Sequence, residues 1–298
     1  KGGFRTQLYT GNGSDNVIDT GIRPGLVWLK NRDSSNAHMW YDNIRGRNTY
    51  LQSNTSDDQA TDTNDLITFG ATGFTLADDA TVNTNGDDYV AWTWEAGSEP
   101  LPNTDGSVSS TVSVNQEYGF SVVQWENTTQ PYTVGHGLGD VPKWIVIKSL
   151  DNNSTNWNVY HESTGNQSRS YLNLTTAASS GEAWMNNTSP TADVFSIGSS
   201  GEFQATVIAY CWAEVEGYSK FGTYTGTGAI NHKIKIGFRP GIVIVKRTTN
   251  ISGSAMGWSI VDSRRGSTQK LQAQNTATEN DGPINAASVT DDITFQDD

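Results

Sequence analysis

The sequence predicts an all-β protein made of tandem antiparallel β-sandwich domains of a jelly-roll-like type. Its apolar residues come in short runs, mostly β-branched or aromatic, and no window shows the apolar stripe of an amphipathic helix. Tight-turn residues such as Asn12-Gly13, Asn85-Gly86 and Asp281-Gly282 separate these runs, because glycine and asparagine tolerate a positive φ. Many short strands with frequent turns are typical of a sandwich or a barrel.

The third observation behind this fold class is an internal repeat. The segment Gly21–Lys30 (GIRPGLVWLK) returns as Gly237–Lys246 (GFRPGIVIVK), and a looser copy is Gly137–Lys148 (GLGDVPKWIVIK). Other landmarks keep the same order in each copy, and one set is Tyr41-Asp42, Tyr160-His161 and Val261-Asp262. The chain therefore contains three copies of one domain-sized unit.

We expect the three units to be separate domains, like beads on a string. A unit of about 100 residues is large enough to hold a hydrophobic core of its own. The predicted organisation is a β-sandwich repeat at 1–97, a linker with an additional strand at 98–117, a second repeat at 118–217 and a third repeat at 218–298.

The third repeat is expected to be incomplete. Ile293-Thr294-Phe295 matches Ile67-Thr68-Phe69, so counterparts of Phe74–Trp94 do not follow in this sequence. A sandwich that lacks its last strand has an open edge. We therefore expect the chain to continue beyond Asp298 or a neighbouring molecule to supply the strand, and we expect further residues before Lys1.

Two strands carry information on packing. Leu26–Lys30 is apolar on both faces, which predicts a cover by the opposite sheet on one side and by a loop, a domain or a subunit on the other. This feature predicts a homo-oligomer. In Val90–Trp94 large and small residues alternate, and we expect the large face to be the sandwich core and the small face to meet another layer. The equivalent strand contains Cys211, which is expected to be a small packing residue.

Composition excludes several classes of partner. The 298 residues carry a net charge of −13, which argues against nucleic acid, because phosphate binding requires a dense Lys/Arg surface. The longest apolar run, Val207–Ala213, is far too short to span a membrane. A single cysteine excludes an intrachain disulfide.

No pattern in the chain predicts catalysis, and we expect a protein that is not an enzyme. Common nucleophile, zinc-protease and nucleotide-binding motifs are absent, and the four histidines lack metal-ligand spacing. A glycosidase needs only two carboxylates across a cleft. The candidates at strand ends are Asp42, Glu95, Glu214 and Asp262, but they occupy equivalent positions of different repeats.

No cofactor is expected, although calcium stays open as an alternative. Two acidic loops, Asn83–Asp88 and Asp151–Asn153, are candidate calcium sites, but neither has EF-hand spacing and such turns form without metal.

Three tryptophans are candidate ligand-binding residues. Trp40, Trp157 and Trp258 lie beside polar residues close to predicted loops, where an exposed indole could stack on a sugar ring. The alternative is that they cap the sandwich. If exposed, they would make the chain a carbohydrate-binding module or adhesin for host-surface polysaccharide.

Several longer phrases resemble a known group of proteins. The phrases are TVGHGLGDVPKWIVIK (133–148), WMNNTSPTADVFSIG (184–198), AYCWAEVEGYSKFGTYTGTG (209–228) and NTDGSVSSTVSVN (103–115). They are similar to the tandem domains of virion structural proteins, often tail-fibre-like, of marine and cyanobacterial phages. The first repeat, with YTGNGSDNVIDTGIRPGLVWLKNRDSSN, resembles a companion domain of the same proteins, so the similarity covers nearly the whole chain.

This resemblance implies a structural or adsorption role on a virus particle, as part of a tail fibre, spike or head decoration. It implies other virion proteins as partners and brings no catalytic residues with it. The sequence departs from the group at Gln124-Trp125, at Asp140 and at its early stop. A disulfide-free, acidic β-protein suits a particle surface, where no cellular system controls thiol oxidation.

Overall fold

The computed structural model describes residues 2–97, 99–199, 202–227, 232–249 and 256–281. Its regular structure consists of antiparallel β-strands and one short 3₁₀ turn, Glu162–Thr164, which confirms the predicted all-β fold class. None of the described residues forms a helix long and apolar enough to cross a membrane.

The first repeat is a sandwich of two unequal sheets. A large sheet has the order β1-β9-β3-β4-β5-β6, and a small sheet, β2-β8-β7, lies against one of its faces. Its strands are β1 (Phe4–Thr10), β2 (Asn16–Asp19), β3 (Pro24–Asn31), β4 (Met39–Asp42), β5 (Thr49–Gln52), β6 (Ala60–Thr61), β7 (Leu66–Phe69), β8 (Gly73–Leu76) and β9 (Asp88–Glu95).

The second repeat has the same plan. Its large sheet has the order β10-β11-β12-β18-β14-β15-β16, and β13 and β17 form the small sheet. The strands are β10 (Leu101–Asn103), β11 (Ser110–Asn115), β12 (Phe120–Glu126), β13 (Tyr132–Gly135), β14 (Pro142–Ser149), β15 (Asn158–His161), β16 (Ser170–Tyr171), β17 (Val194–Ile197) and β18 (Thr206–Ala213). β10 and β11 lie in the segment where the sequence predicts a linker with an additional strand.

In the third repeat, one sheet is described, with the order β19-β20-β21-β22. Its strands are β19 (Ile242–Val245), β20 (Ser259–Asp262), β21 (Gly266–Gln272) and β22 (Asn280–Asp281). β19 corresponds to β3 and β14, which are flanked by β9 and β18 respectively. Within the described residues, β19 pairs with β20 alone. The predicted match at 293–295 lies outside the described residues.

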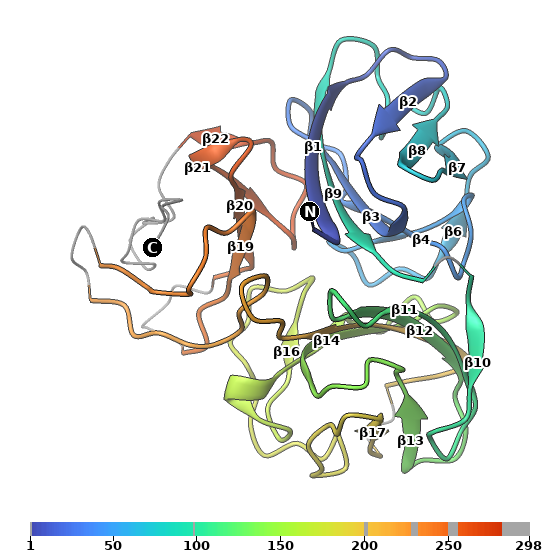
Figure 1. The fold of residues 1–298 in the computed structure, drawn as a ribbon, viewed down its shortest axis with the longest axis vertical. Coiled ribbons are helices and arrows are strands. Elements are labelled where there is room, and N and C mark those ends of the chain that lie inside the picture. The colour runs from blue at the N-terminus through green and yellow to red at the C-terminus, as the bar shows by residue number, and fades with distance from the viewer. Residues whose placement is uncertain (1, 98, 200–201, 228–231, 250–255, 282–298) are drawn as a thin grey trace.

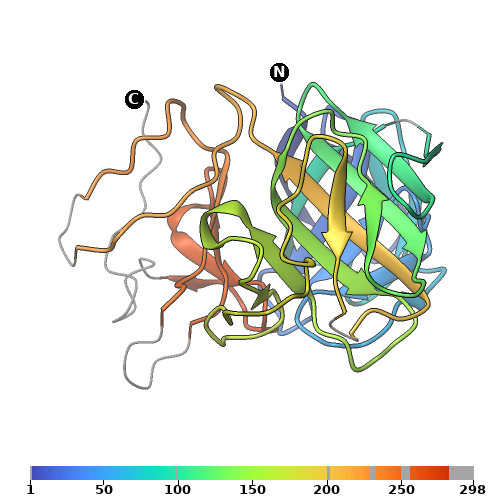
Figure 2. The ribbon, with the colours of Figure 1, turned by 90° about the horizontal axis from the view of Figure 1, so that it is seen from below.

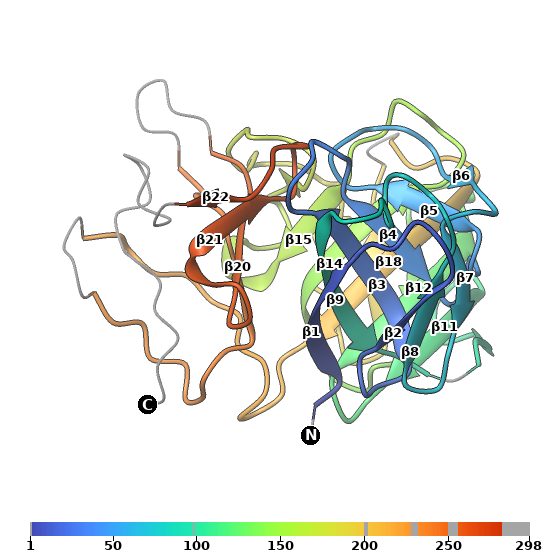
Figure 3. The same ribbon diagram turned by 90° about the horizontal axis from the view of Figure 1, so that it is seen from above.

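The three repeats pack side by side around a shared core, so the prediction of beads on a string is wrong. Figure 1 shows the first repeat (blue), the second (green to yellow) and the third (orange to red) grouped around one centre. The views from below and above show the third repeat beside the other two (Figures 2 and 3). The cause is the second apolar face of each large sheet, which the repeats cover for one another.

The prediction for the two faces of the last strand is also wrong. The large residues Val90, Trp92 and Trp94 of β9 point into the core between the repeats. The small residue Ala91 instead packs inside its own sandwich, as Ala209 and Cys211 do in the second repeat. Small side chains let the small sheet approach closely, whereas the bulky face fills the wider space where the repeats meet.

Candidate functional site

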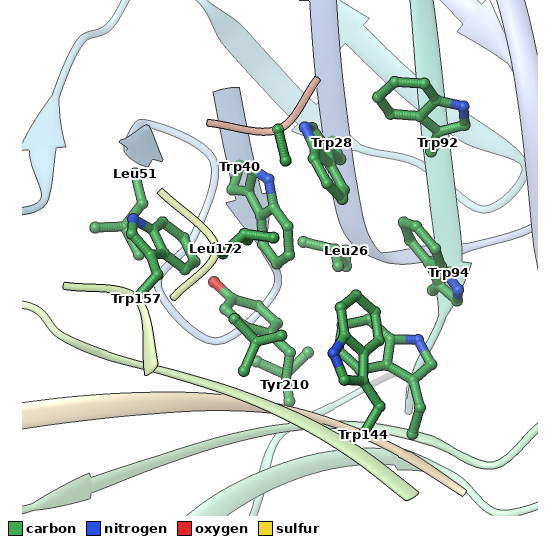
Figure 4. Close-up of a cluster of buried hydrophobic side chains, with 14 of the residues drawn as sticks. Leu26, Trp28, Trp40, Leu51, Trp92, Trp94, Trp144, Trp157, Leu172 and Tyr210 are labelled. Carbon is green, nitrogen blue, oxygen red and sulfur yellow. The ribbon is translucent and has the colours of Figure 1, made fainter. Parts of the chain in front are cut away.

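The dominant feature of the molecule is this core between the repeats, which we call the inter-repeat core (Figure 4). It takes large side chains from the central strands of each large sheet, and nearly all are less than a few per cent exposed. Its aromatic members are Trp28, Trp40, Trp92 and Trp94 from the first repeat, Phe120, Trp144, Trp157, Tyr210 and Trp212 from the second, and Trp258 from the third. Full burial of a large apolar side chain stabilises a fold by about 1.5–3 kcal/mol.

Aromatic rings contact one another across the boundaries between repeats. Trp40 lies 5.0 Å from Trp157 between ring centroids. Trp94 lies 5.8 Å from Trp212. Trp144 of the second repeat also lies 6.1 Å from Trp258 of the third. Tilted and edge-on ring pairs at these separations add stability beyond the buried area.

The three tryptophans predicted as exposed sugar platforms are therefore buried, and that prediction is wrong. Trp40 and Trp157 are 0% exposed and Trp258 is 6% exposed. Nearby polar residues misled the prediction, although Trp40 lies within β4 and Trp157 and Trp258 directly precede β15 and β20. The alternative prediction, that the three rings are packing residues, agrees better with the structure. They fill the space between repeats and do not cap a single sandwich.

Two of these indoles also tie neighbouring repeats together. Trp157 Nε1 donates to the carbonyl of Gln52 in the first repeat at 3.1 Å. Trp258 Nε1 donates to the carbonyl of Tyr171 in the second repeat at 2.9 Å. His38 occupies the corresponding position in the first repeat, where its Nδ1 accepts from Trp28 Nε1 at 2.8 Å. Burial, together with the charges of Lys30 and Arg265, lowers the pKa of His38 well below its usual value, so the ring stays neutral.

A buried aspartate–arginine pair recurs in two repeats. Asp42 contacts Arg45 Nε at 2.6 Å, and Asp262 contacts Arg265 Nε at 2.5 Å. Each aspartate also caps the following turn through two backbone N–H groups. Burial of an ion pair is tolerated only where hydrogen bonds satisfy its remaining atoms.

A neighbouring repeat completes each of these pairs. The hydroxyl of Tyr210 donates to Asp42 Oδ2 at 2.8 Å. The indole of Trp92 donates to Asp262 Oδ2 at 3.1 Å. Tyr210 and Trp92 occupy the same position of β18 and β9, so the second repeat contacts the first as the first contacts the third. The second and third repeats meet through different contacts, the Trp258–Tyr171 hydrogen bond and the Trp144–Trp258 ring pair, so all three repeats touch one another in a ring.

The lysine that ends each copy of the repeated motif is a third recurring anchor. Lys148 Nζ donates to the carbonyl of Ser56 in the preceding repeat at 3.1 Å. Lys246 Nζ likewise reaches the carbonyl of Leu174 at 3.3 Å. Lys30 donates to Asn31 O at 2.6 Å within its own repeat. Burial lowers the pKa of each of the three to about 8.

Glu279 closes the ring between the third and first repeats. Its carboxylate contacts Arg32 at 2.7 Å and Arg265 at 2.8 Å, and its backbone N–H donates to the Arg32 carbonyl at 3.0 Å. The equivalent backbone bond joins Gln59 to Leu150, between the first and second repeats, at 2.8 Å. The same contact thus recurs at two boundaries.

Comparison with known proteins gives one match. The profile of a family described as "Domain of unknown function (DUF7483)" matches residues 2–295. The chain belongs to this family. No curated protein and no solved structure matches the sequence.

Three of the four carboxylates considered as catalytic candidates in this DUF7483 member are held by structural contacts. Asp42 and Asp262 are each bound to an arginine at different boundaries, and Glu214 contacts Lys220 at 2.6 Å. Cys211 is fully buried, and burial raises the pKa of its thiol. His136 is also buried, with Nε2 lying 3.1 Å from the Thr191 carbonyl.

The two predicted calcium loops are held by protein donors. Asn83 is fully buried and donates to the carbonyls of Ser14 and Ala77. Asp87 accepts from Asn31 and Ser34. In the second loop, Asp151 accepts from the Thr206 amide at 3.2 Å. Hydrogen bonds within the protein therefore tie both loops to neighbouring segments of the chain.

Sequence reasoning missed the aspartate–arginine anchors, although a signal for them exists. Asp42–Gly46 (DNIRG) and Asp262–Gly266 (DSRRG) share the pattern Asp-x-x-Arg-Gly. The pattern stands nine residues before Leu51 in one repeat and nine before Leu271 in the other. The second repeat has His161 at this position, which hides the motif from a search for a threefold pattern.

Proposed function

We propose that this chain is a non-enzymatic structural protein of a virus particle, exposed as part of a tail fibre, spike or head decoration. The observation that carries the proposal is that the buried ionisable groups make structural contacts between repeats. The aspartates, arginines and lysines that repeat along the chain hold the three repeats together. The resemblance of the sequence to phage virion proteins supports the same role.

The physical design suits a particle that persists outside a cell. The inter-repeat core is dense in tryptophan and contains no disulfide, so its stability does not depend on redox conditions. A closed ring of three repeats also resists local opening, because each repeat loses contacts with two neighbours when it separates.

The structure does not support a role in host adsorption through sugar stacking. The three tryptophans that suggested it lie inside the protein. The proposal therefore rests on architecture, and binding of host polysaccharide is not part of it.

Immunogold labelling of purified virus particles tests the location. Antibodies raised against the purified chain should decorate intact particles, and mass spectrometry should find the chain among the particle proteins. Unlabelled particles that lack the chain, together with its presence in the lysate of infected cells, would contradict the proposal.

We propose that a strand from outside the described residues pairs with β19, supplied by a continuation of the chain or by a neighbouring protein of the particle. The outer edge of β19 carries no strand among the described residues, whereas β9 and β18 cover the corresponding edges of β3 and β14. By this analogy the added strand alternates large and small residues, and its central aromatic residue lies against the His161 position. Exposed strand edges are templates for this kind of addition.

A peptide copying β18, Thr206–Ala213, provides the probe for this edge. It should bind the intact chain, and a control peptide of the same composition with large and small residues exchanged should not. Equal binding of both peptides, or binding of neither, would contradict the proposed strand addition.

A further inference from the structure

Three carboxylates converge in the first sandwich, beside Tyr41 and Leu66 of the core between its own two sheets. Asp62 and Asp65 lie in the turn between β6 and β7, and Asp79 lies in the turn between β8 and β9. One oxygen from each falls within 4.8 Å of the others. Backbone hydrogen bonds from Ala77 to Asp65 and from Asp79 to Asn64 hold the two turns together.

One oxygen of each carboxylate accepts hydrogen bonds from the protein, and the other oxygen has no protein donor among the described residues. Asp62 Oδ1 accepts from the Asn64 amide at 2.8 Å, and Asp79 Oδ1 accepts from the Thr81 amide at 2.6 Å. Asp65 Oδ2 accepts from the Tyr41 hydroxyl at 2.7 Å. Three oxygens therefore remain, one from each residue.

The remaining oxygen of Asp65 points to a ligand independently of the spacing of the three carboxylates. Asp65 is 1% exposed, and its Oδ1 is buried without any hydrogen-bond partner. A buried carboxylate oxygen left unpaired is costly, and native structures rarely tolerate one. No lysine or arginine among the described residues forms an ion pair with any of the three aspartates.

We propose that Asp62, Asp65 and Asp79 bind a calcium ion that locks the two turns of the first sandwich together. Calcium takes oxygen ligands at about 2.3–2.6 Å, so ligands on opposite sides of the ion lie about 5 Å apart, which fits the observed spread. Magnesium requires a tighter octahedron. Backbone carbonyls and water supply the remaining ligands of such a site.

The three carboxylates also raise one another's cost of ionisation. Burial, with the nearby charges of Asp79 and Asp62, raises the pKa of Asp65 to about 7, against the lowering effect of the Tyr41 hydrogen bond. A bound cation reverses this shift and keeps Asp65 ionised. The site is distinct from both acidic loops predicted from the sequence.

Thermal unfolding of the full chain in EDTA and in millimolar calcium tests the proposal. Calcium should raise Tm by several degrees, and magnesium at the same concentration should raise it much less. Asp65→Asn should abolish the calcium shift while its Tm in EDTA stays at or above that of the wild type, because it removes a buried charge. Asp151→Asn, the matched control from another acidic loop, should keep the full shift.

Terbium provides a direct readout through energy transfer from Tyr41 and Tyr50. Its sensitised emission should appear with the wild type, compete with calcium, and fall at least tenfold in Asp65→Asn. If that variant does not fold, the half-buried Asp62→Asn should show the same loss. No calcium shift in the wild type, an equal magnesium shift, or a full calcium shift in both variants would overturn the proposal.

Discussion

The hydroxyl of Tyr210 in the second repeat donates a hydrogen bond of 2.8 Å to Asp42 Oδ2 of the first repeat, within the inter-repeat core. Asp42 is fully buried and already accepts from Arg45 Nε and from two backbone N–H groups, so the tyrosine supplies its fourth hydrogen bond. The same role falls to Trp92 toward Asp262 at the next boundary. At each of these two boundaries, one hydrogen bond from the last strand of a repeat joins it to the aspartate–arginine pair of its neighbour.

Tyr210→Phe should lower the free energy of unfolding by about 1–3 kcal/mol, because it leaves a charged group with one partner fewer in a buried site. Urea denaturation of the full chain measures the loss. Tyr171→Phe is the matched control, since that hydroxyl makes a longer 3.4 Å contact with Glu202 and is only half-buried. Equal losses in the two variants would remove the special role of Tyr210.

Trp157→Ala should destabilise the chain by about 3–5 kcal/mol, because it opens a large cavity in the inter-repeat core. Trp157→Phe should cost less, since it keeps most of the volume and loses mainly the hydrogen bond to Gln52. Chemical denaturation of both variants gives the comparison. A loss below about 1 kcal/mol for Trp157→Ala would mean that the indole is not packed as described.

The buried lysines predict a rise in stability between pH 8 and 9.5. Folded lysine with a pKa of about 8 releases its proton in this range, whereas unfolded lysine keeps it up to its usual pKa of 10.5. The unfolded state then binds more protons, so the free energy of unfolding increases with pH.

Lys148→Met should make this rise less steep, with Lys30 and Lys246 supplying the rest, and the exposed Lys233→Met should leave it unchanged. Urea denaturation at pH 8.0, 8.5, 9.0 and 9.5 measures the slope for each variant. A slope in Lys148→Met that equals the wild-type slope would show that Lys148 titrates normally.

His38 should make the free energy of unfolding depend on pH in the acid range. Its folded pKa lies well below 6.5, so at lower pH the unfolded chain takes up a proton that the folded chain excludes. Stability is therefore lost as the pH falls below about 6.5. His38→Gln keeps an acceptor for Trp28 without a titrating group, and it should lose less stability between pH 6.5 and 4.5 than the wild type. Parallel curves for the two proteins would contradict the assignment.

The fold class and the repeats could be predicted from the sequence, because both depend on local patterns. Runs such as Leu26–Lys30 identify buried strands, and their recurrence identifies the units. The requirement for a cover on both faces of that strand was also correct. The identity of the cover was not predictable, since a doubly apolar strand looks the same beneath another repeat and beneath another subunit.

The individual anchors were harder to predict for a physical reason. The partner of Asp42 lies 168 residues away in Tyr210, and no local pattern records such a pairing. The three tryptophans were placed at the surface because polar residues lie nearby, but the rings are covered by other repeats, which no local pattern records. Asp65 was missed because Asp62 and Asp79 come from different turns, which only the folded chain brings together.

Hydrogen exchange of the intact chain carrying Trp40→Ala tests the shared core most directly. This variant removes a side chain of the first repeat that packs on Trp157 and Tyr210 of the second. If the repeats form one body, backbone amides of β14 and β18 should exchange faster along with those of β3 and β9. Faster exchange confined to the first repeat, with the second unchanged, would show that the repeats are independent domains and would contradict the account.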